Sequence, residues 1–352
     1  MSVLSYFFDE TDLEHSFLVG YYGGGNYGDE LLLEVILNVI EPKHYKGLSI
    51  AYQNPQTYEQ YHHSFGHKLV DMSKPWQFVR KLITSRSIVI GGGGLWGMDT
   101  NLKTFGLSAL LWMSRYLLFK KVYLVGVGYY GSAGRLGHIS AWLAGKAATT
   151  IIVRDEESAQ QFSSINANVQ QDRDVAWLAA SIPAEAYQKE VEQIEKIAPV
   201  TSKSLFIALR HFRGQQAEEY HKQIGNFIES NQDKPIIVAL LQRAETYPEG
   251  QRLLQSWRQL YPNVHVLEAT VNPMGVYLFM QKHQHQLALI APQFHAIITA
   301  HMNQIPFLPI VYDNKVSQLL TQLKLRASLP IENLRQTELQ QFADAFYAGS
   351  TV

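Results

Sequence analysis

The sequence contains no cysteine and carries almost no net charge. Without cysteine the chain can have no disulfide, no thiolate metal site and no cysteine nucleophile, which fits a reducing compartment. Lys and Arg number 30 and Asp and Glu number 31, so no excess of positive charge favours generic nucleic-acid binding. Charged residues make up only 17% of the chain and apolar residues 46%. This balance is typical of a globular protein with a large core.

Long uninterrupted hydrophobic runs are also missing. The most apolar segment, Leu107–Val125, is broken by serines, by Arg115 and by the pair Lys120–Lys121, whereas about 18 consecutive apolar residues are needed to span a bilayer. We interpret this segment as a buried helix that leads into a strand, with a peripheral contact at the inner membrane face as the alternative. Residues 1–17 lack the basic region of a secretory signal, so we expect a cytoplasmic location.

The apolar residues that are present form two series of strand-like runs separated by helix-like segments. Because such strands are apolar throughout, they predict parallel sheets covered by helices on both faces. The length of 352 residues suits two domains. We predict an α/β fold with two doubly wound, Rossmann-like domains facing a cleft, formed by residues 1–185 and 200–352. The C-terminal helix either stays with the second domain or packs back on the first.

The first loop with potential chemistry follows the first strand. "GYYGGGNYGDE" supplies Gly24, Gly25 and Asn26 ahead of a helix that begins near Asp29 and Glu30. Glycines permit positive φ and let backbone N–H groups approach a ligand, and a helix N-terminus favours an anion. The spacing fits neither a dinucleotide fingerprint nor a P-loop. The alternative is a tight turn before a capped helix.

A second glycine-rich loop ends the strand "SIVIGGGG". Consecutive glycines such as Gly92 and Gly93 cost chain entropy, so a close approach by a ligand or by a neighbouring backbone must compensate. Asp99 follows a few residues later and is a candidate general base, or else the N-cap of the next helix.

Two arginines stand at strand ends in equivalent places of the two series. Arg154 lies in "VRDEES" and Arg210 in "IALRHFRG", where His211 and Arg213 can add positive charge. A guanidinium at such a position binds a carboxylate or a phosphate through its planar fork. The alternative for Arg154 is a structural ion pair with an aspartate, with Asp155 as the adjacent candidate.

The last candidate residues lie in "APQFHAIITAHMNQIPFLPIVYDNKV". His295 opens a helix-like segment and Lys315 follows the last strand. The two histidines of this segment have neither the H-E-x-x-H nor the H-x-x-x-H spacing, and we expect no metal site and no cofactor.

Taken in order, "GNYGDE", "GGGGLW", "VGVGYYG", "VRDEES", "DVAW" and "FHAIITA…IPFLPIVYDNKV" resemble the polysaccharide pyruvyl transferases over residues 19–325. The resemblance implies a two-domain GT-B fold, with the acceptor on the first domain and the donor on the second. It also implies transfer of pyruvate from phosphoenolpyruvate onto two hydroxyls of a sugar, as a ketal, in exopolysaccharide and cell-envelope biosynthesis.

The resemblance assigns Arg154, His295 and Lys315 to the donor. Our candidate catalytic residues are His295, as general acid or phosphate ligand, and Asp99 or Asp29, as acceptor of the sugar proton. The partner it implies is a sugar or a lipid-linked oligosaccharide, while oligomerisation and a peripheral membrane contact stay open. The family pattern has a cation two residues before the histidine, where this chain has Gln293. A GT-B glycosyltransferase using a nucleotide sugar is one alternative, for which Glu245 and Glu249 are the poorly spaced ribose-binding candidates. A catalytically silent sugar-binding homologue is the other.

Overall fold

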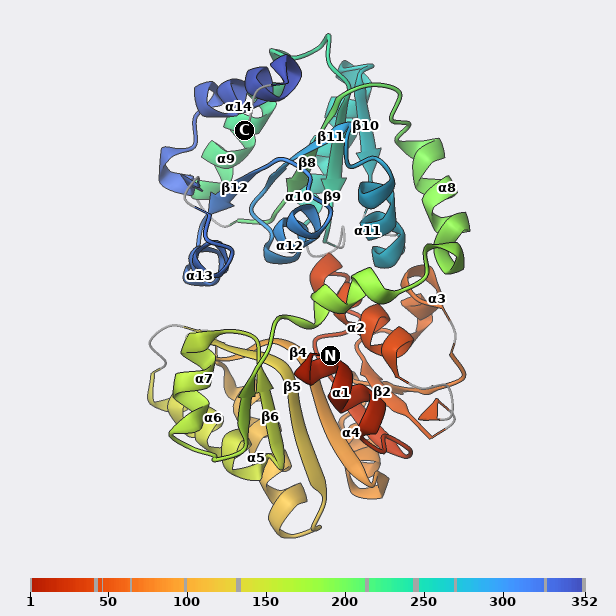
Figure 1. Ribbon diagram of the computed structural model, residues 1–352, viewed down its shortest axis with the longest axis vertical. Coiled ribbons are helices and arrows are strands. Elements are labelled where there is room, and N and C mark those ends of the chain that lie inside the picture. The colour runs from red at the N-terminus through yellow and green to blue at the C-terminus, as the bar shows by residue number, and fades with distance from the viewer. Residues whose placement is uncertain are drawn as a thin grey trace. The chain divides into compact units, whose positions relative to one another are not determined.

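The computed structural model describes residues 2–40, 44–45, 47–63, 65–97, 100–130, 134–212, 215–242, 247–268, 271–325 and 328–349. The chain forms two compact units (Figure 1). The first contains residues 1–24 and 29–182, and the second contains residues 25–28 and 183–352. The short segment Gly25–Gly28 thus contacts the second unit although its neighbours on both sides belong to the first.

The first unit is built on a seven-stranded parallel sheet with the order β3-β2-β1-β4-β5-β6-β7. Its elements are α1 Val3–Glu10, β1 Ser16–Val19, α2 Tyr27–Val39, β2 Ser49–Tyr52, α3 Tyr58–Tyr61, β3 Lys68–Asp71, α4 Pro75–Thr84, β4 Ser87–Gly97, α5 Leu102–Tyr116, β5 Lys121–Tyr130, α6 Arg135–Ala147, β6 Thr150–Val153, α7 Glu156–Ser163 and β7 Val169–Gln171, with 3₁₀ helices at Pro55–Thr57 and Val175–Ser181.

The second unit is built on a six-stranded parallel sheet with the order β10-β9-β8-β11-β12-β13. Its elements are α8 Gln188–Ile197, β8 Ser204–Leu209, α9 Gln215–Glu229, β9 Ile236–Leu240, α10 Pro248–Leu260, β10 Val264–Leu267, α11 Pro273–Lys282, β11 Leu287–Ala291, α12 Phe294–Met302, β12 Phe307–Val311, α13 Asn314–Gln322, β13 Leu329–Pro330 and α14 Gln336–Ala348, with 3₁₀ helices at Ala184–Tyr187 and Ile331–Asn333. The C-terminal helix α14 packs on α9 of the same unit.

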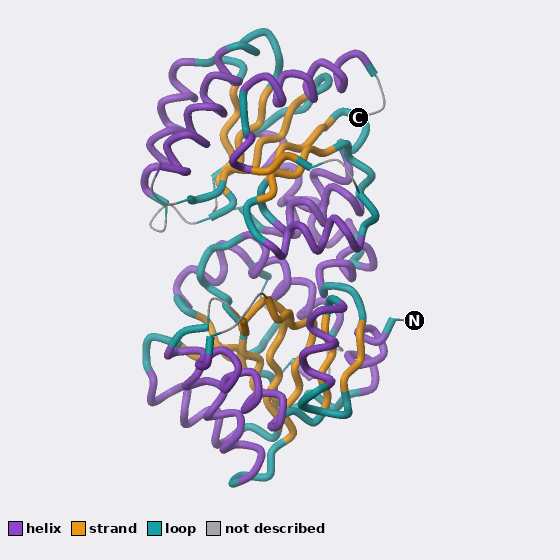
Figure 2. Tube along the Cα trace, turned by 90° about the vertical axis from the view of Figure 1, so that its left-hand side faces the viewer, coloured by secondary structure: helices purple, strands orange, loops and turns teal. Residues whose placement is uncertain are grey.

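The strands explain why each unit is layered. Every residue of the central strands β8, β9 and β11 is buried, whereas the edge strand β7 is largely exposed. Buried parallel strands need helices on both faces, and Figure 2 shows helices on the two sides of each sheet. The predicted α/β class with Rossmann-like, doubly wound sheets is therefore confirmed. No helix in the described ranges is both long and apolar enough to cross a membrane.

Helix α5 differs from the expectation of a buried helix. Ser108, Leu111 and Ser114 form its buried side. Met113 and Tyr116 are exposed, as is the turn that follows the helix. The helix therefore buries one face only.

One glycine in β5 is expected to control the pairing of this strand. Gly126 has φ +66°, and a Cβ at this position would overlap the Val175 side chain. The register between β5 and β6 also shifts here, between Val125 and Val127. Alanine would need a strained backbone and a displaced Val175, so Gly126→Ala is expected to lower the free energy of unfolding by about 1–3 kcal/mol.

Gly106 supplies the matched control. It lies inside α5, and a Cβ there would meet nothing within 4 Å. Gly106→Ala is expected to raise the free energy of unfolding by roughly 0.5–1 kcal/mol. Denaturant unfolding of both variants provides the measurement, and equal effects at the two positions would contradict the argument.

Candidate functional site

The loop after β1 needs glycine for two different reasons, a left-handed backbone at some positions and space at another. Gly23 and Gly25 have φ +79° and +69°, so these two positions need glycine for the left-handed backbone. Gly24 has no positive φ, but a Cβ there would lie 2.9 Å from the Tyr21 ring. The expectation of positive φ is therefore met at two of the loop glycines, and at Gly24 the need is for space.

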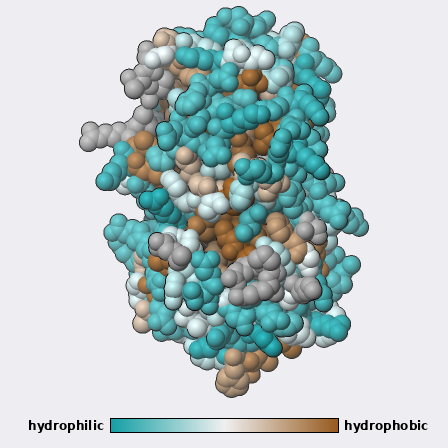
Figure 3. Space-filling view, turned by 45° about the vertical axis from the view of Figure 1, so that its right-hand side comes forward, coloured by the Kyte–Doolittle hydropathy of each residue, from teal (hydrophilic) through white to brown (hydrophobic). Residues whose placement is uncertain are grey.

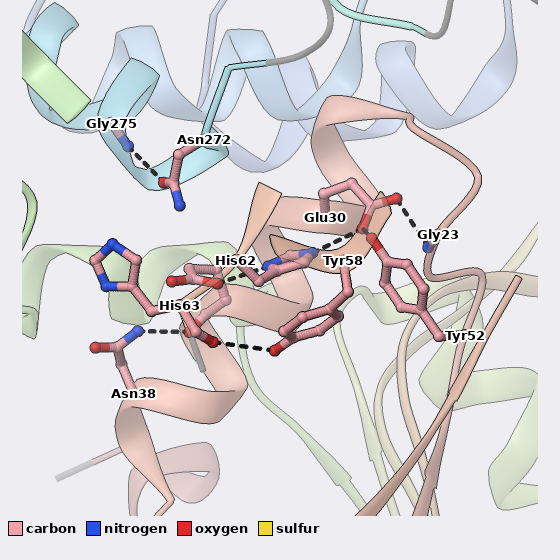
Figure 4. Close-up of polar contacts among 10 residues, drawn as sticks. Gly23, Glu30, Asn38, Tyr52, Tyr58, His62, His63, Asn272 and Gly275 are labelled. Carbon is pink, nitrogen blue, oxygen red and sulfur yellow. Dashed lines mark hydrogen bonds and ion pairs between the residues drawn. The ribbon is translucent and has the colours of Figure 1, made fainter. Parts of the chain in front are cut away.

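A buried cluster of Glu30, His62 and Glu34 fixes this loop (Figure 4). Glu30 Oε1 accepts a hydrogen bond from the backbone N–H of Gly23 at 2.9 Å, and its Oε2 accepts one from the Tyr52 hydroxyl at 3.2 Å. The His62 ring lies between the two carboxylates, with Nε2 2.9 Å from Glu30 and Nδ1 2.6 Å from Glu34. Glu30 therefore does more than complement the helix dipole, because it joins the loop to α2 and to His62.

The charge of His62 follows from its partners. Burial lowers the pKa of His62, but the hydrogen bonds to Glu30 and Glu34 and the negative charges of these residues outweigh burial and raise the pKa to about 9. Burial and the neighbouring His62 lower the pKa of His67 to about 4. Near neutral pH the cluster consequently holds one imidazolium between two carboxylates, while His67 is neutral.

The glycines at the end of β4 pack against the loop after β1. The Tyr22 hydroxyl donates a hydrogen bond to the carbonyl of Gly91, which leaves no room for a Cβ at that position. Gly92 and Gly93 have φ +74° and +86°. Among the described residues, a Cβ at Gly93 would meet Asp29 Oδ1, at 3.9 Å. Neighbouring side chains thus explain Gly91, whereas Gly93 is needed for its positive φ and lies beside the Asp29 carboxylate.

Arg154 is buried at the carboxyl end of β6. Its Nη1 lies 2.5 Å from Asp174 Oδ2, and its Nε donates to the Tyr130 hydroxyl at 2.5 Å. Asp155, the adjacent candidate partner, is instead the N-cap of α7 and accepts a hydrogen bond from Tyr130. Arg154 Nη2 lies 3.7 Å from the position that a Cβ would take at Gly94. The guanidinium is thus held between β5, β6 and the glycines of β4.

In the second unit the segment Gly25–Gly28 lies against α12. The Tyr27 backbone N–H donates to the Leu241 carbonyl at 2.9 Å, and the Tyr27 hydroxyl lies 3.0 Å from Thr299 Oγ1. The ring of His295, in the first turn of α12, occupies the place that a Cβ would take at Gly28. Gly28 therefore permits the close packing of His295, and its own φ is not positive.

Two cations surround Tyr312 at the carboxyl end of β12. The Arg210 guanidinium lies 4.3 Å from the centre of the Tyr312 ring, and Lys315 Nζ lies 5.6 Å from it. Lys315 also contacts Asp313, the N-cap of α13, at 3.2 Å. The buried Nε of Arg210 has no acceptor within the described part of the chain. We call Arg210, Tyr312 and Lys315 the cationic cluster.

Gln293 occupies the position at which the family pattern has a cation. It is the N-cap residue of α12 and is buried, and its Nε2 donates to the carbonyl of Leu209 at the end of β8. Its Oε1 finds no hydrogen-bond partner in the residues that the structure describes. A neutral amide thus stands beside the strand that carries Arg210.

The structure brings some of the predicted residues together and leaves others apart. Arg210 and Lys315 share Tyr312, and β8, β11 and β12, which precede Arg210, His295 and Lys315, are neighbours in one sheet. Gly93 and Asp29 meet in the first unit, which also contains Arg154. The predicted meeting of Arg154 with His295 and Lys315 stays a prediction. Asn26 directly precedes α2.

Three predicted residues lie outside the described residues, namely Asp99, Arg213 and Glu245. Glu249, the second nucleotide-sugar candidate, lies 3.5 Å from His221 Nδ1. Sequence reasoning missed His62, Tyr130 and Tyr312, because their partners are distant in the chain. Asp174, Tyr130 and Tyr312 lie within the quoted motifs "DVAW", "VGVGYYG" and "IPFLPIVYDNKV", whereas His62 lies in none of them. The described residues contain no group of three His, Asp or Glu side chains that could hold a metal ion.

Comparison with known proteins gives one family and one fold. The model of the family described as polysaccharide pyruvyl transferase matches residues 26–314. No curated protein sequence matches significantly.

Among solved structures, the UDP-GlcNAc 2-epimerase from Neisseria meningitidis bound to UDP-GlcNAc is similar, with a TM-score of 0.64, 12% identity and coverage of 96% of this chain and 94% of that one. The UDP-GlcNAc 2-epimerase from Methanocaldococcus jannaschii gives 0.59 at 10% identity, covering 94% and 91%. Anabaena HepE in complex with UDP-glucose gives 0.57 at 10% identity, covering 95% and 90%. At this identity the likeness shows the GT-B-type fold alone.

The buried cluster of Glu30, His62 and Glu34 makes the free energy of unfolding decrease as the pH becomes alkaline. The pKa of His62 is about 9 in the folded chain, above the value of about 6.5 expected after unfolding. The stabilisation from protonated His62 is therefore complete below pH 6.5 and is lost as the pH rises through about 9, by on the order of 3 kcal/mol.

Denaturant unfolding between pH 6 and pH 10, with the wild type compared to His62→Gln, provides the measurement. The variant is expected to be less stable near pH 6 and to lose less stability than the wild type between pH 7 and pH 9.5. Parallel stability curves for the two proteins would contradict the assigned charge of His62.

Proposed function

The chain belongs to the polysaccharide pyruvyl transferase family, and from this premise we propose that it transfers pyruvate from phosphoenolpyruvate onto two hydroxyls of a sugar in a polysaccharide precursor. The observation that carries the proposal is the cationic cluster, in which Arg210 and Lys315 both lie beside the Tyr312 ring at one edge of the second sheet. The product is a cyclic ketal, and phosphate is released.

The donor requires several fixed cations because it carries both a phosphate and a carboxylate. Arg210 can present its fork in two parallel hydrogen bonds to either group, since its Nε has no acceptor in the described ranges. Lys315 adds a second charge, and its contact with Asp313 holds the ammonium near the first turn of α13. Stacking on Tyr312 restricts the Arg210 side chain before the donor binds, which lowers the entropic cost of binding.

His295 occupies a place suited to proton transfer. It lies in the first turn of α12, where the helix dipole favours a bound anion. We assign it as the general acid that protonates the methylene carbon of phosphoenolpyruvate, with retention of the phosphate as its alternative role. Packing against Gly28, the last residue of "GNYG", fixes the orientation of the His295 ring, so this glycine helps to position the imidazole.

In the proposed reaction two sugar hydroxyls attack the same carbon in succession, and all atoms and protons are accounted for. Protonation of the methylene carbon leaves an oxocarbenium ion at the neighbouring carbon, and the first sugar hydroxyl attacks that carbon. The carbon–oxygen bond to phosphate then breaks, and the second hydroxyl closes the ketal ring. Of the two hydroxyl protons, one replaces the proton delivered to the new methyl group and the other leaves with phosphate. Cations near the leaving group lower the barrier by stabilising its growing charge.

In the first unit, Asp29 beside Gly93 is the proposed acceptor of a sugar proton. Asp99 is the second proposed base. We assign Gly24 and Gly92 to the same acceptor region, and we propose Gly25 and Asn26 as further substrate-binding residues.

Arg154 is proposed to neutralise the leaving group. Because Asp174 and Tyr130 hold two of its nitrogens, the guanidinium is oriented before the substrate binds, and Asp174 offsets part of its charge.

Gln293 is the point at which this chain departs from the family pattern. Its amide donates to the Leu209 carbonyl, one residue before Arg210. We propose that Arg210 supplies the cation that position 293 lacks, and that Gln293 holds the end of β8 from which Arg210 projects. The neutral amide avoids placing an additional buried charge beside that guanidinium.

Removing Arg210 is expected to weaken donor binding. Charge-assisted hydrogen bonds contribute about 1.5–3 kcal/mol, so Arg210→Ala should raise KM for phosphoenolpyruvate by roughly 10- to 100-fold, and Lys315→Ala should raise it less. Arg258→Ala, which removes an exposed cation from α10, is the control and should match the wild type. Phosphate release and ketal formation, followed by mass spectrometry with a diol-bearing sugar, provide the readouts.

Unchanged donor affinity in both site variants would contradict the assigned site. Turnover with a UDP-sugar in place of phosphoenolpyruvate would support the glycosyltransferase alternative, and binding of sugar without turnover of any donor would support the silent homologue.

Replacement of His295 tests the assigned proton transfer. Because general acid catalysis contributes about 10²- to 10⁴-fold, His295→Gln should lower kcat by that factor while KM for phosphoenolpyruvate changes little. Steady-state kinetics across pH provide the measurement. A variant that keeps kcat and loses donor affinity would show that the imidazole holds the phosphate and transfers no proton.

A further inference from the structure

Helices α5 and α6 of the first unit expose a group of large apolar side chains. The two helices pack against each other. The exposed residues are Leu102, Met113, Tyr116, Leu117, Leu118, Phe119, Ile139 and Trp142, and we call them the α5–α6 apolar face. Single exposed apolar residues are normal, but a contiguous group marks an interaction surface. In Figure 3 apolar atoms gather at the lowest part of the first unit, which is the end that α5 and its following turn reach in Figure 1.

Helical spacing groups these residues on each helix, and one hydrogen bond connects the two helices. Met113 and Tyr116 lie three residues apart on α5, and Ile139 and Trp142 lie three residues apart on α6, so each pair shares one side of its helix. The Tyr116 hydroxyl donates to the carbonyl of Lys146 on α6 at 3.0 Å. The C-terminal ends of the two helices are therefore tied together.

The charge of this region is one-sided. All 31 acidic residues of the chain lie outside residues 100–154, so neither helix carries a negative side chain. The exposed cations Lys103, Lys121, Arg135 and Lys146 belong to this segment. The chain as a whole has a formal net charge of −1. Exposed apolar side chains together with cations alone therefore favour a partner surface that is both apolar and negatively charged.

Phe119 indicates that the face does not serve folding. Its side chain is 84% exposed, and its backbone has φ +53°. A bulky residue in the left-handed region costs the folded state about 1–2 kcal/mol, and an exposed ring recovers none of this by burial. An aromatic residue kept under strain at the tip of a turn is best explained by a contact outside the molecule.

We propose that the α5–α6 apolar face docks the protein on the surface of a bilayer that contains anionic lipids. Trp142 and Tyr116 have the amphipathic rings that settle at the headgroup level, and Leu117 and Phe119 can enter the acyl boundary. Each nearby cation strengthens the attraction to anionic headgroups about fivefold. A second copy of the chain is the less suitable occupant, because a two-fold contact would place the same cations opposite one another. The proposal does not depend on the proposed reaction.

Vesicle co-sedimentation of the full chain tests the proposal. We expect binding to vesicles of phosphatidylcholine with about 30% phosphatidylglycerol to be at least tenfold tighter than binding to phosphatidylcholine alone. Raising the salt from about 0.1 to 0.5 M should weaken the binding, since screening shortens the reach of the surface potential.

Matched variants separate docking from folding. Leu117→Ser should weaken binding about tenfold or more, whereas Leu260→Ser, which removes a similarly exposed leucine from α10 of the second unit, should leave it unchanged. Phe119→Asn should weaken binding while Tm stays equal or rises, because asparagine tolerates the left-handed backbone. The double variant Lys121→Gln with Lys146→Gln should weaken binding to the anionic vesicles about 25-fold.

Three results would overturn the proposal. The first is equal binding to anionic and neutral vesicles, and the second is wild-type vesicle affinity in Phe119→Asn. The third is sedimentation velocity that shows a dimer sensitive to Leu117→Ser in a protein that ignores vesicles, which would make the face an interface between copies. None of these results bears on pyruvyl transfer, which the kinetic assay tests separately.

Discussion

The parallel alignment of strands is the constraint on which both parts of the site depend. In a parallel sheet all carboxyl ends meet at one edge, so loops that are distant in the sequence become neighbours. In the first sheet this places the loop after β1 beside the glycines of β4 and the Arg154 that follows β6. In the second sheet it places Arg210, Gln293 and Lys315 on adjacent strand ends.

Glycine residues make the close packing of these loops possible. At Gly28, Gly91 and Gly94 the missing Cβ leaves the volume that His295, Tyr22 and Tyr130 occupy. Each of these side chains belongs to the candidate site or holds its backbone. These glycines therefore serve mainly to leave room for functional side chains, and less to bind phosphate through their own backbone. Gly93, beside Asp29, is the exception, because its positive φ requires glycine.

Buried charges in the first unit are compensated by charges of opposite sign. His62 is protonated between two carboxylates and Arg154 is paired with Asp174, so neither leaves an isolated charge in the core. In the second unit, Arg210 lies beside the Tyr312 ring and Lys315 contacts the Asp313 carboxylate.

The sequence by itself determined the fold class, because the alternation of apolar strands and amphipathic helices is local information, and the order of the motifs indicated the family. It also indicated Arg210, which directly follows a strand, and His295 and Lys315, which lie in the first turns of the helices after two other strands. Only the tertiary structure decided the pairing of Arg154 with Asp174 instead of Asp155, the role of Glu30 as a partner of His62, and the stacking of both cations on Tyr312. Sequence spacing carries no signal for contacts between residues that only the sheet brings together, since their separation along the chain depends on the helices and loops between the strands.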